Sequence, residues 1–255
     1  MNTSGHNPFE PARPQVPKQD PADPEFRRVE AGRGLEWLRQ GWQCFLASPG
    51  LWICITALWV VVMVVLNLVP LFGMIAATLL ASVTVGGLMQ GCRSLSRGEG
   101  LAIDHLWAGF GDRVNPLLAL GGWYLAAMFA VSLLVLLLSA LVAGVAGLAA
   151  LAALVVVSAM TSLLLVFAVL LMAPVLMAMW FAPALVMFHR MTALDAMRAS
   201  FFASLGNAPA FVVFALIYIV LVVLASIPAM LGWLALLPVT FGAMYASYRD
   251  VFLQD

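Results

Sequence analysis

Polar side chains that could bind a ligand gather where two long apolar stretches end. The aromatic, basic and acidic residues at these two places form a candidate polar cluster of Trp180, Pro183, His189, Arg190, Arg198, Tyr245, Tyr248, Arg249 and Asp250. Residues of these types commonly anchor helix ends at a membrane–water interface. The same set could instead bind a lipid head group or a partner protein, and the sequence leaves both interpretations open.

The chain offers little that could catalyse a reaction. Gly109 to Asp112 match the GxGD tetrapeptide of intramembrane aspartyl proteases, but those enzymes need a second Asp within the membrane, and here Asp112 lies in a charged loop beside Arg113. The sequence contains no GxSxG, HExxH or P-loop lysine motif. It therefore predicts a protein that is not an enzyme, with no catalytic residues, cofactor or metal site.

The cysteines are Cys44, Cys54 and Cys92, without CxxC or other paired spacing. Such spacing predicts neither a disulfide framework nor a zinc site. Free cysteine is often buried as a small apolar residue, so we expect structural roles for all three.

The composition is that of a membrane protein. Hydrophobic residues make up 64% of the chain and charged residues 9%, whereas soluble domains contain about 45–50% and about 25%. Uncharged runs longer than the roughly 18 residues that mark a spanning helix recur along the chain. We therefore predict an all-α, polytopic helical membrane protein.

The pattern divides the chain into two parts. Residues 1–31 are rich in proline and charge and predict a disordered cytoplasmic tail. Residues 32–252 predict one transmembrane domain with six spans in three hairpins. The expected spans cover approximately residues 51–69, 71–91, 117–142, 151–188, 210–226 and 230–248.

The fourth span is exceptionally long. Residues 151–188 carry no charge, and as one straight helix they would extend about 57 Å, far beyond a hydrocarbon core of about 30 Å. Proline breaks helical hydrogen bonding, so Pro174 and Pro183 are the expected break points. We predict one kinked span, with a re-entrant piece as the alternative.

A short amphipathic helix precedes each expected hairpin. Apolar residues recur at helical spacing over residues 35–46, 103–110 and 191–205, and each segment is followed by a proline close to Ser or Asn, at Ser48-Pro49, Asn115-Pro116 and Asn207-Ala208-Pro209. This weak repeat predicts three similar units around a pseudo-threefold axis. Alternatively, Ser-Pro and Asn-Pro merely suit the turn into the membrane.

Charge distribution predicts the orientation. With six spans, all twelve basic and all twelve acidic residues fall on one side, and the three opposite turns are uncharged. Lys and Arg accumulate in short cytoplasmic loops, so both termini are expected in the cytoplasm. Five or seven spans would move Arg190, Arg198 and Arg249 to the other side.

Gly87 and Gly91 form a GxxxG motif in the second expected span. Glycines at this spacing allow helices to approach closely. They are candidate packing residues, either within one chain or between two copies.

Four stretches resemble an uncharacterised family of polytopic inner-membrane proteins of proteobacteria. They are residues 34–39 (GLEWLR), 181–186 (FAPALV), 193–200 (ALDAMRAS) and 245–250 (YASYRD). The resemblance covers about residues 32–252 and implies a bacterial inner-membrane location. It implies no known activity, substrate or cofactor.

Together these features predict a non-enzymatic inner-membrane protein. Its expected partners are the lipid bilayer, a second copy of itself or another membrane protein, and not a nucleic acid. The alternative is a transporter or channel for a small neutral or amphiphilic solute, which the kinked helices would suit.

Overall fold

The computed structural model describes residues 25–146, 153–227 and 230–253, and within these ranges every regular element is a helix. The α-helices are α1 Arg33–Ala47, α2 Pro49–Asn67, α3 Phe72–Ser96, α4 Val114–Ala146, α5 Ala153–Trp180, α6 Ala182–Phe188, α7 Ala193–Gly206, α8 Ala208–Ser226 and α9 Trp233–Phe252. Two short 3₁₀ helices, η1 Ile103–Leu106 and η2 Ala108–Phe110, lie between α3 and α4. The predicted all-α class is confirmed.

Five helical segments of the described chain are long and apolar enough to cross a membrane. They are Pro49–Asn67, Phe72–Ser96, Val114–Leu141, Ser162–Phe188 and Ala208–Ser226. The molecule is thus a multi-pass helical membrane protein. The sixth expected span falls on α9, which carries Arg249 and Asp250 and is not in this set, so the count of six stays a prediction.

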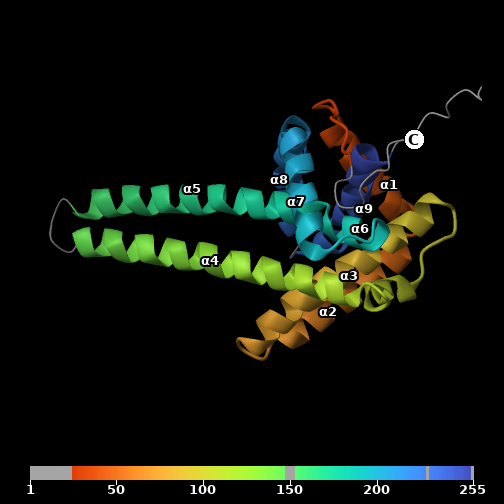
Figure 1. Cartoon of the computed structure of the whole chain (residues 1–255), viewed down its shortest axis with the longest axis horizontal. Coiled ribbons are helices and arrows are strands. Elements are labelled where there is room, and N and C mark those ends of the chain that lie inside the picture. Colours follow the sequence, from red (N-terminus) through yellow and green to blue (C-terminus); the bar gives the residue numbers. More distant parts are fainter. Residues whose placement is uncertain (1–24, 147–152, 228–229, 254–255) are drawn as a thin grey trace, which may run out of the picture.

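Helices α4 and α5 form a long hairpin that projects away from the rest of the molecule, while α1, α6, α7 and α9 gather near its base (Figure 1). With 33 residues, α4 extends about 50 Å, more than the hydrocarbon core of about 30 Å. The third expected span ended at residue 142, whereas α4 stays helical to Ala146; residues 147–152 lie outside the described chain.

Helix α1 differs from the expected interfacial helix because it is built into the protein. Its buried face consists of Gly34, Trp37, Leu38, Gly41 and Phe45. The two glycines allow backbone contact: a Cβ on Gly34 would strike the Ala210 carbonyl of α8, and one on Gly41 would strike the Val239 carbonyl of α9. The outer face of α1 still exposes apolar side chains, namely Leu35, Trp42 and Leu46.

The expected kinked span divides at Phe181, about two turns after Pro174 and two residues before Pro183. Pro174 lies inside α5, whereas the helical hydrogen bonding is interrupted at Phe181, between α5 and α6. In a continuous helix the Phe181 N–H would donate to the Met177 carbonyl. Instead it donates to the Ser200 hydroxyl at 2.9 Å, and that hydroxyl donates to the Met177 carbonyl at 2.7 Å. A serine of α7 thereby satisfies both backbone groups at the break.

The other two amphipathic segments also pack on the protein. The segment 103–110 forms η1 and η2 rather than an α-helix, with Gly109 in contact with the Val83 carbonyl of α3. In α7, Thr192 accepts a hydrogen bond from the Asp195 N–H at 3.3 Å and donates one to the Asp195 carboxylate at 2.6 Å, as expected of a cap at this spacing.

Residues 25–31 differ from the tail expected over residues 1–31, whose first 24 residues lie outside the described chain. The Arg27 N–H donates to the Val251 carbonyl at 2.8 Å, and the Val29 N–H donates to the Asn207 side chain at 2.7 Å. Asn207 is fully buried and returns a hydrogen bond to the Arg27 carbonyl at 3.0 Å. These backbone hydrogen bonds fix the segment against α7 and α9.

Candidate functional site

The predicted polar cluster separates into three groups at the charged end of the helices. The first joins α5, α6 and α9: the indole of Trp180 donates to Ser247 at 2.9 Å, and His189 hydrogen-bonds the Tyr248 hydroxyl at 2.8 Å. Pro183 is buried in the first turn of α6. Burial lowers the pKa of His189, so this histidine is neutral near pH 7.

The second group surrounds Asp250, and we name Arg27, Arg33, Trp37 and Asp250 the Asp250 cluster. Arg33 binds the carboxylate with two hydrogen bonds of 2.7 and 2.8 Å, the Trp37 indole donates at 2.9 Å, and Arg27 donates at 3.2 Å. The Asp250 side chain is only 8% exposed, whereas those of Arg33 and Arg27 are 40% and 56% exposed. The cluster ties the start of α1 to the end of α9.

The acidity of Asp250 follows from these donors. Burial by itself raises the pKa of a carboxyl, but hydrogen bonds from Arg33 and Trp37 and the charges of Arg33 and Arg27 outweigh it and lower the pKa of Asp250 below its ordinary value. The same hydrogen bond to Asp250 raises the pKa of Arg33. Both groups are therefore charged at neutral pH.

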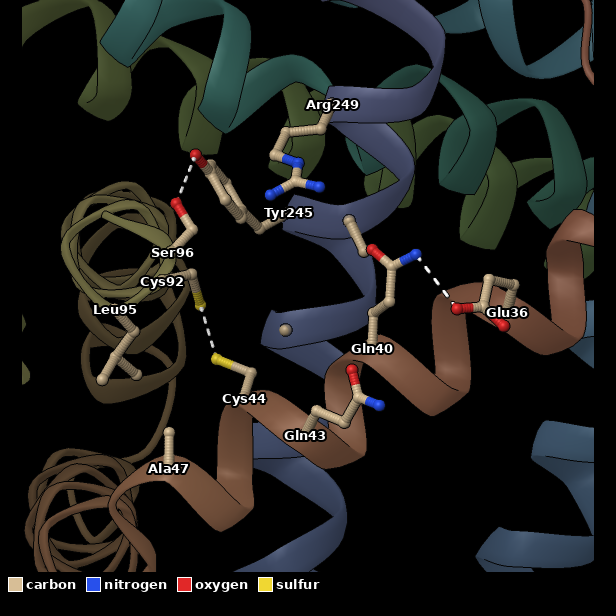
Figure 2. Close-up of a pocket in the computed structure, with 12 residues that line it drawn as sticks. Glu36, Gln40, Gln43, Cys44, Ala47, Cys92, Leu95, Ser96, Tyr245 and Arg249 are labelled. Carbon is tan, nitrogen blue, oxygen red and sulfur yellow. Dashed lines mark hydrogen bonds between the residues drawn. The ribbon is translucent and has the colours of Figure 1, made fainter. Parts of the chain in front are cut away.

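The third group lines an open cleft of about 370 Å³ between α1, α3 and α9 (Figure 2). We call it simply the cleft, and its walls are Glu36, Gln40, Gln43, Cys44, Ala47, Cys92, Leu95, Ser96, Gly242, Tyr245, Ala246 and Arg249. Of the predicted cluster, only Tyr245 and Arg249 belong to it. The Tyr245 hydroxyl lies 3.3 Å from that of Ser96, which joins α9 to the end of α3.

Arg249 points into the cleft toward Gln40 (Figure 2). Its Nε atom is buried and has no hydrogen-bond partner in the described chain. The carboxylate in the cleft, Glu36, already accepts a hydrogen bond from Gln40 at 3.3 Å and lies 3.8 Å from Arg39. The cleft thus presents an unpaired guanidinium beside amide and hydroxyl groups.

Two cysteines meet in the wall of the cleft. The sulfurs of Cys44 on α1 and Cys92 on α3 are 3.9 Å apart (Figure 2). Either thiol can donate, and when Cys44 is ionised the Cys92 thiol stabilises the thiolate; this lowers the pKa of Cys44 despite the opposing effect of burial. The sequence predicts separate structural roles for these cysteines, because residues 48 positions apart give no spacing signal.

The remaining candidates lie elsewhere. Arg190 and Arg198 are exposed and belong to none of the three groups. Gly87 and Gly91 pack within the chain: a Cβ on Gly87 would strike the His105 carbonyl of η1, and one on Gly91 would come within 3.0 Å of the Leu101 side chain. The GxxxG motif therefore packs against the segment between α3 and α4, and not against another long helix.

Sequence reasoning missed most of the residues that α1 contributes. Arg33, Trp37, Gln40 and Cys44 all reach the site because α1 lies against α9. The available signal was the spacing of Gly34 and Gly41, seven residues apart on one face of α1. That spacing allows a helix to lie close to neighbouring backbones.

The comparisons with known proteins agree with this architecture. The chain is 29% identical over 249 residues to a probable inner membrane protein of Burkholderia thailandensis, an alignment that covers 88% of this chain and 92% of that protein. No family model matches the chain, and no solved structure matches it. The likeness agrees with the resemblance to an uncharacterised family of polytopic inner-membrane proteins. The chain is a multi-pass membrane protein similar to a probable inner membrane protein of a bacterium.

Proposed function

We propose that this protein is a non-enzymatic component of the bacterial inner membrane that acts by packing with lipid, with itself or with another membrane protein. The observation that carries the proposal is the α4–α5 hairpin. In the described chain, the most apolar 18-residue stretch of each of its helices contains no buried residue. Phe129, Leu136 and Leu170 are each more than 60% exposed, so their apolar surface must be covered by molecules other than this chain.

The proposed orientation has both termini in the cytoplasm. The hydrogen bonds between Arg33 and Asp250 bring the two described ends of the chain together, which supports an even number of crossings and hence six spans. The basic loops lie at the same end, since the Arg93 guanidinium stacks over the Phe188 ring at 4.8 Å. Basic residues on one side favour the cytoplasm.

Cysteine substitutions test the orientation. Leu68→Cys in the exposed α2–α3 turn and Arg198→Cys on α7 would be made in a background without the native cysteines. A membrane-impermeant maleimide should label Leu68→Cys in intact spheroplasts and Arg198→Cys only after permeabilisation. Labelling of both sites before permeabilisation would contradict the proposed topology.

Native mass spectrometry of protein extracted with its surrounding lipid tests the packing. A dimer, a retained lipid or a co-purifying protein at fixed stoichiometry is expected. Crosslinking of Phe129→Cys between copies would identify self-association through the hairpin, and Leu120→Cys, at a buried position of α4, is the matched control. A bare monomer without bound lipid would contradict the proposal and direct attention to solute flux in vesicles.

A further inference from the structure

The guanidinium of Arg249 has a buried donor, its Nε–H, that lacks a partner in the described chain. A buried donor without a partner costs about 1–3 kcal/mol, and more when the group is charged, so proteins rarely keep one unless a water, an ion or a ligand completes it. Asp250, the next residue, cannot serve because Arg27, Arg33 and Trp37 already donate to its carboxylate. In the described chain, Nε of Arg249 is left without an acceptor.

The charges around Arg249 favour an anion. On its other side a smaller cavity of about 120 Å³ is lined by Arg27, Arg33, Arg249 and Asp250, three guanidinium groups and one carboxylate. Within the cleft, the carboxylate of Glu36 has Arg39 as a cationic neighbour at 3.8 Å. Three guanidinium charges and one carboxylate leave two positive charges uncompensated, and Arg249 is the guanidinium of this cavity that makes no hydrogen bond to Asp250 in the described chain.

The cleft has the size and polarity of a small binding site. Its volume of about 370 Å³ lies in the range of about 300–1,000 Å³ found for ligand pockets. Gln40 and Gln43 also line the cleft, although Gln40 already donates one amide N–H to Glu36. The planar fork of arginine suits the oxygens of phosphate. A phosphate group with a small polar substituent would fit these donors.

The position of the cleft suggests that its phosphate group could come from a phospholipid. Its walls include Leu95 and Ser96 from the last turn of the apolar helix α3, and α1 exposes Trp42 and Leu46 on its outer face. Exposed tryptophan and leucine on a short amphipathic helix are typical of the head-group layer of a bilayer. Phospholipid phosphates would therefore lie at the level of the cleft.

We propose that the cleft binds a phosphate-bearing anion through Arg249, with the amide of Gln43 and the second N–H of the Gln40 amide as further donors. A phospholipid head group and a soluble phosphate ester share this chemistry. The inference deepens the proposed function by naming a ligand, and it rests on that function only for the position of the cleft in the membrane.

The test compares three purified full-length proteins: wild type, Arg249→Gln and, as a matched control, Arg198→Gln on the exposed face of α7. The probes are dihexanoyl phosphatidylglycerol, glycerol 3-phosphate and uncharged dihexanoylglycerol. Binding is measured by calorimetry in a non-ionic detergent. The expected result is saturable binding of a phosphate-bearing probe to wild type and to Arg198→Gln, with affinity at least about tenfold lower in Arg249→Gln, the loss of about one charge-assisted contact.

Each outcome decides a point. Binding of the short-chain lipid alone identifies a head-group site, whereas equal binding of glycerol 3-phosphate identifies a soluble phosphate ester. Dihexanoylglycerol binding as tightly as the phosphate probes, or equal affinities in wild type and Arg249→Gln, overturns the proposal. Gln43→Leu changes another residue of the same cleft and should weaken binding less than Arg249→Gln. It provides a second test of the cleft if Arg249→Gln does not fold. If none of the probes bound, but native mass spectrometry still showed an oligomer or bound lipid, the phosphate site would be wrong and the proposed function would stand.

Discussion

Asp250 and Arg249 are consecutive residues of α9, yet their surroundings are opposite. The Asp250 carboxylate accepts four hydrogen bonds from three side chains. The Arg249 guanidinium faces an open cleft, and its buried Nε has no partner in the described chain. A helix turns by about 100° per residue, so adjacent side chains of α9 face different neighbours.

The difference separates a structural charge from one that is available for binding. Asp250 holds the ends of α1 and α9 together, and its donors belong to the same chain. Arg249 contributes a desolvated donor that stabilises nothing described in the fold. Charged groups of the second kind often mark functional sites, since the fold tolerates their cost only when a ligand offsets it.

The largest expected effect follows from neutralising Asp250. Asp250→Asn should lower the free energy of unfolding by about 2 kcal/mol, less than the about 3–5 kcal/mol for breaking a fully buried pair, because Arg27 and Arg33 are about half exposed and can be solvated. Thermal unfolding in detergent should show a lower midpoint. An unchanged midpoint would mean that the Asp250 cluster does not hold α1 to α9.

The pH dependence of the wild type provides a control for that prediction. Because the folded-state pKa of Asp250 is lowered, the cluster contributes fully above the unfolded-state pKa of about 3.9. The contribution is lost as the pH falls through the lower folded-state pKa. The difference between wild type and Asp250→Asn should therefore be constant from neutral pH down to about pH 5 and shrink below about pH 4.

A smaller effect is expected from removing one neutral donor of the cluster. Trp37→Phe deletes the indole N–H that binds Asp250 and should cost about 1–2 kcal/mol, from the hydrogen bond and the smaller ring together. Trp52→Phe is the matched control, since Trp52 is equally buried and donates to the Cys44 carbonyl at 3.0 Å. In the Asp250→Asn background the effect of Trp37→Phe should shrink and that of Trp52→Phe should not.

Substitution of Arg249 should barely change stability. Arg249→Gln removes a guanidinium whose buried Nε has no partner in the described chain, so the unfolding free energy should change by less than about 0.5 kcal/mol or rise. Thermal unfolding midpoints of Arg249→Gln and Asp250→Asn, measured under the same conditions, compare the two effects on stability. A comparable loss in both variants would remove the distinction between the two residues.

Sequence patterns predict the membrane class and most helices for a clear physical reason. Lipid requires long uncharged helices, so the five segments that can span a membrane follow from composition alone. The break of the fourth span near Pro183 also follows from the missing proline N–H. Ser200, which completes that break from α7, could not be predicted because its role depends on how two helices pack.

The cleft was also harder to predict, because it depends on how distant helices pack. Tyr245 and Arg249 were in the predicted cluster, but Gln40, Cys44 and Cys92 come from α1 and α3, distant in sequence. An apolar pattern shows that α1 is amphipathic, yet it does not distinguish a face packed on lipid from one packed on α9. Leu38 and Phe45 turned inward while Leu35, Trp42 and Leu46 remained exposed.

The last prediction concerns the reactivity of Cys44, which reports on the cleft itself. Maleimide should react with Cys44 in a Cys54→Ala background, because Cys44 is partly accessible and Cys92 is buried. Cys92→Ala should slow this reaction near pH 7, since loss of the Cys92 thiol raises the pKa of Cys44 and reduces its thiolate fraction.

Measuring that reaction rate against pH separates ionisation from access. At a pH above the pKa of Cys44 in both variants the thiol is ionised in each, so their rates should converge if the Cys92 thiol acts on the pKa. A constant ratio at every pH would instead indicate altered access. Dihexanoyl phosphatidylglycerol should protect Cys44 in the wild-type cleft and not in Arg249→Gln, because both residues line the same space. Equal protection in both would place the lipid somewhere other than beside Arg249.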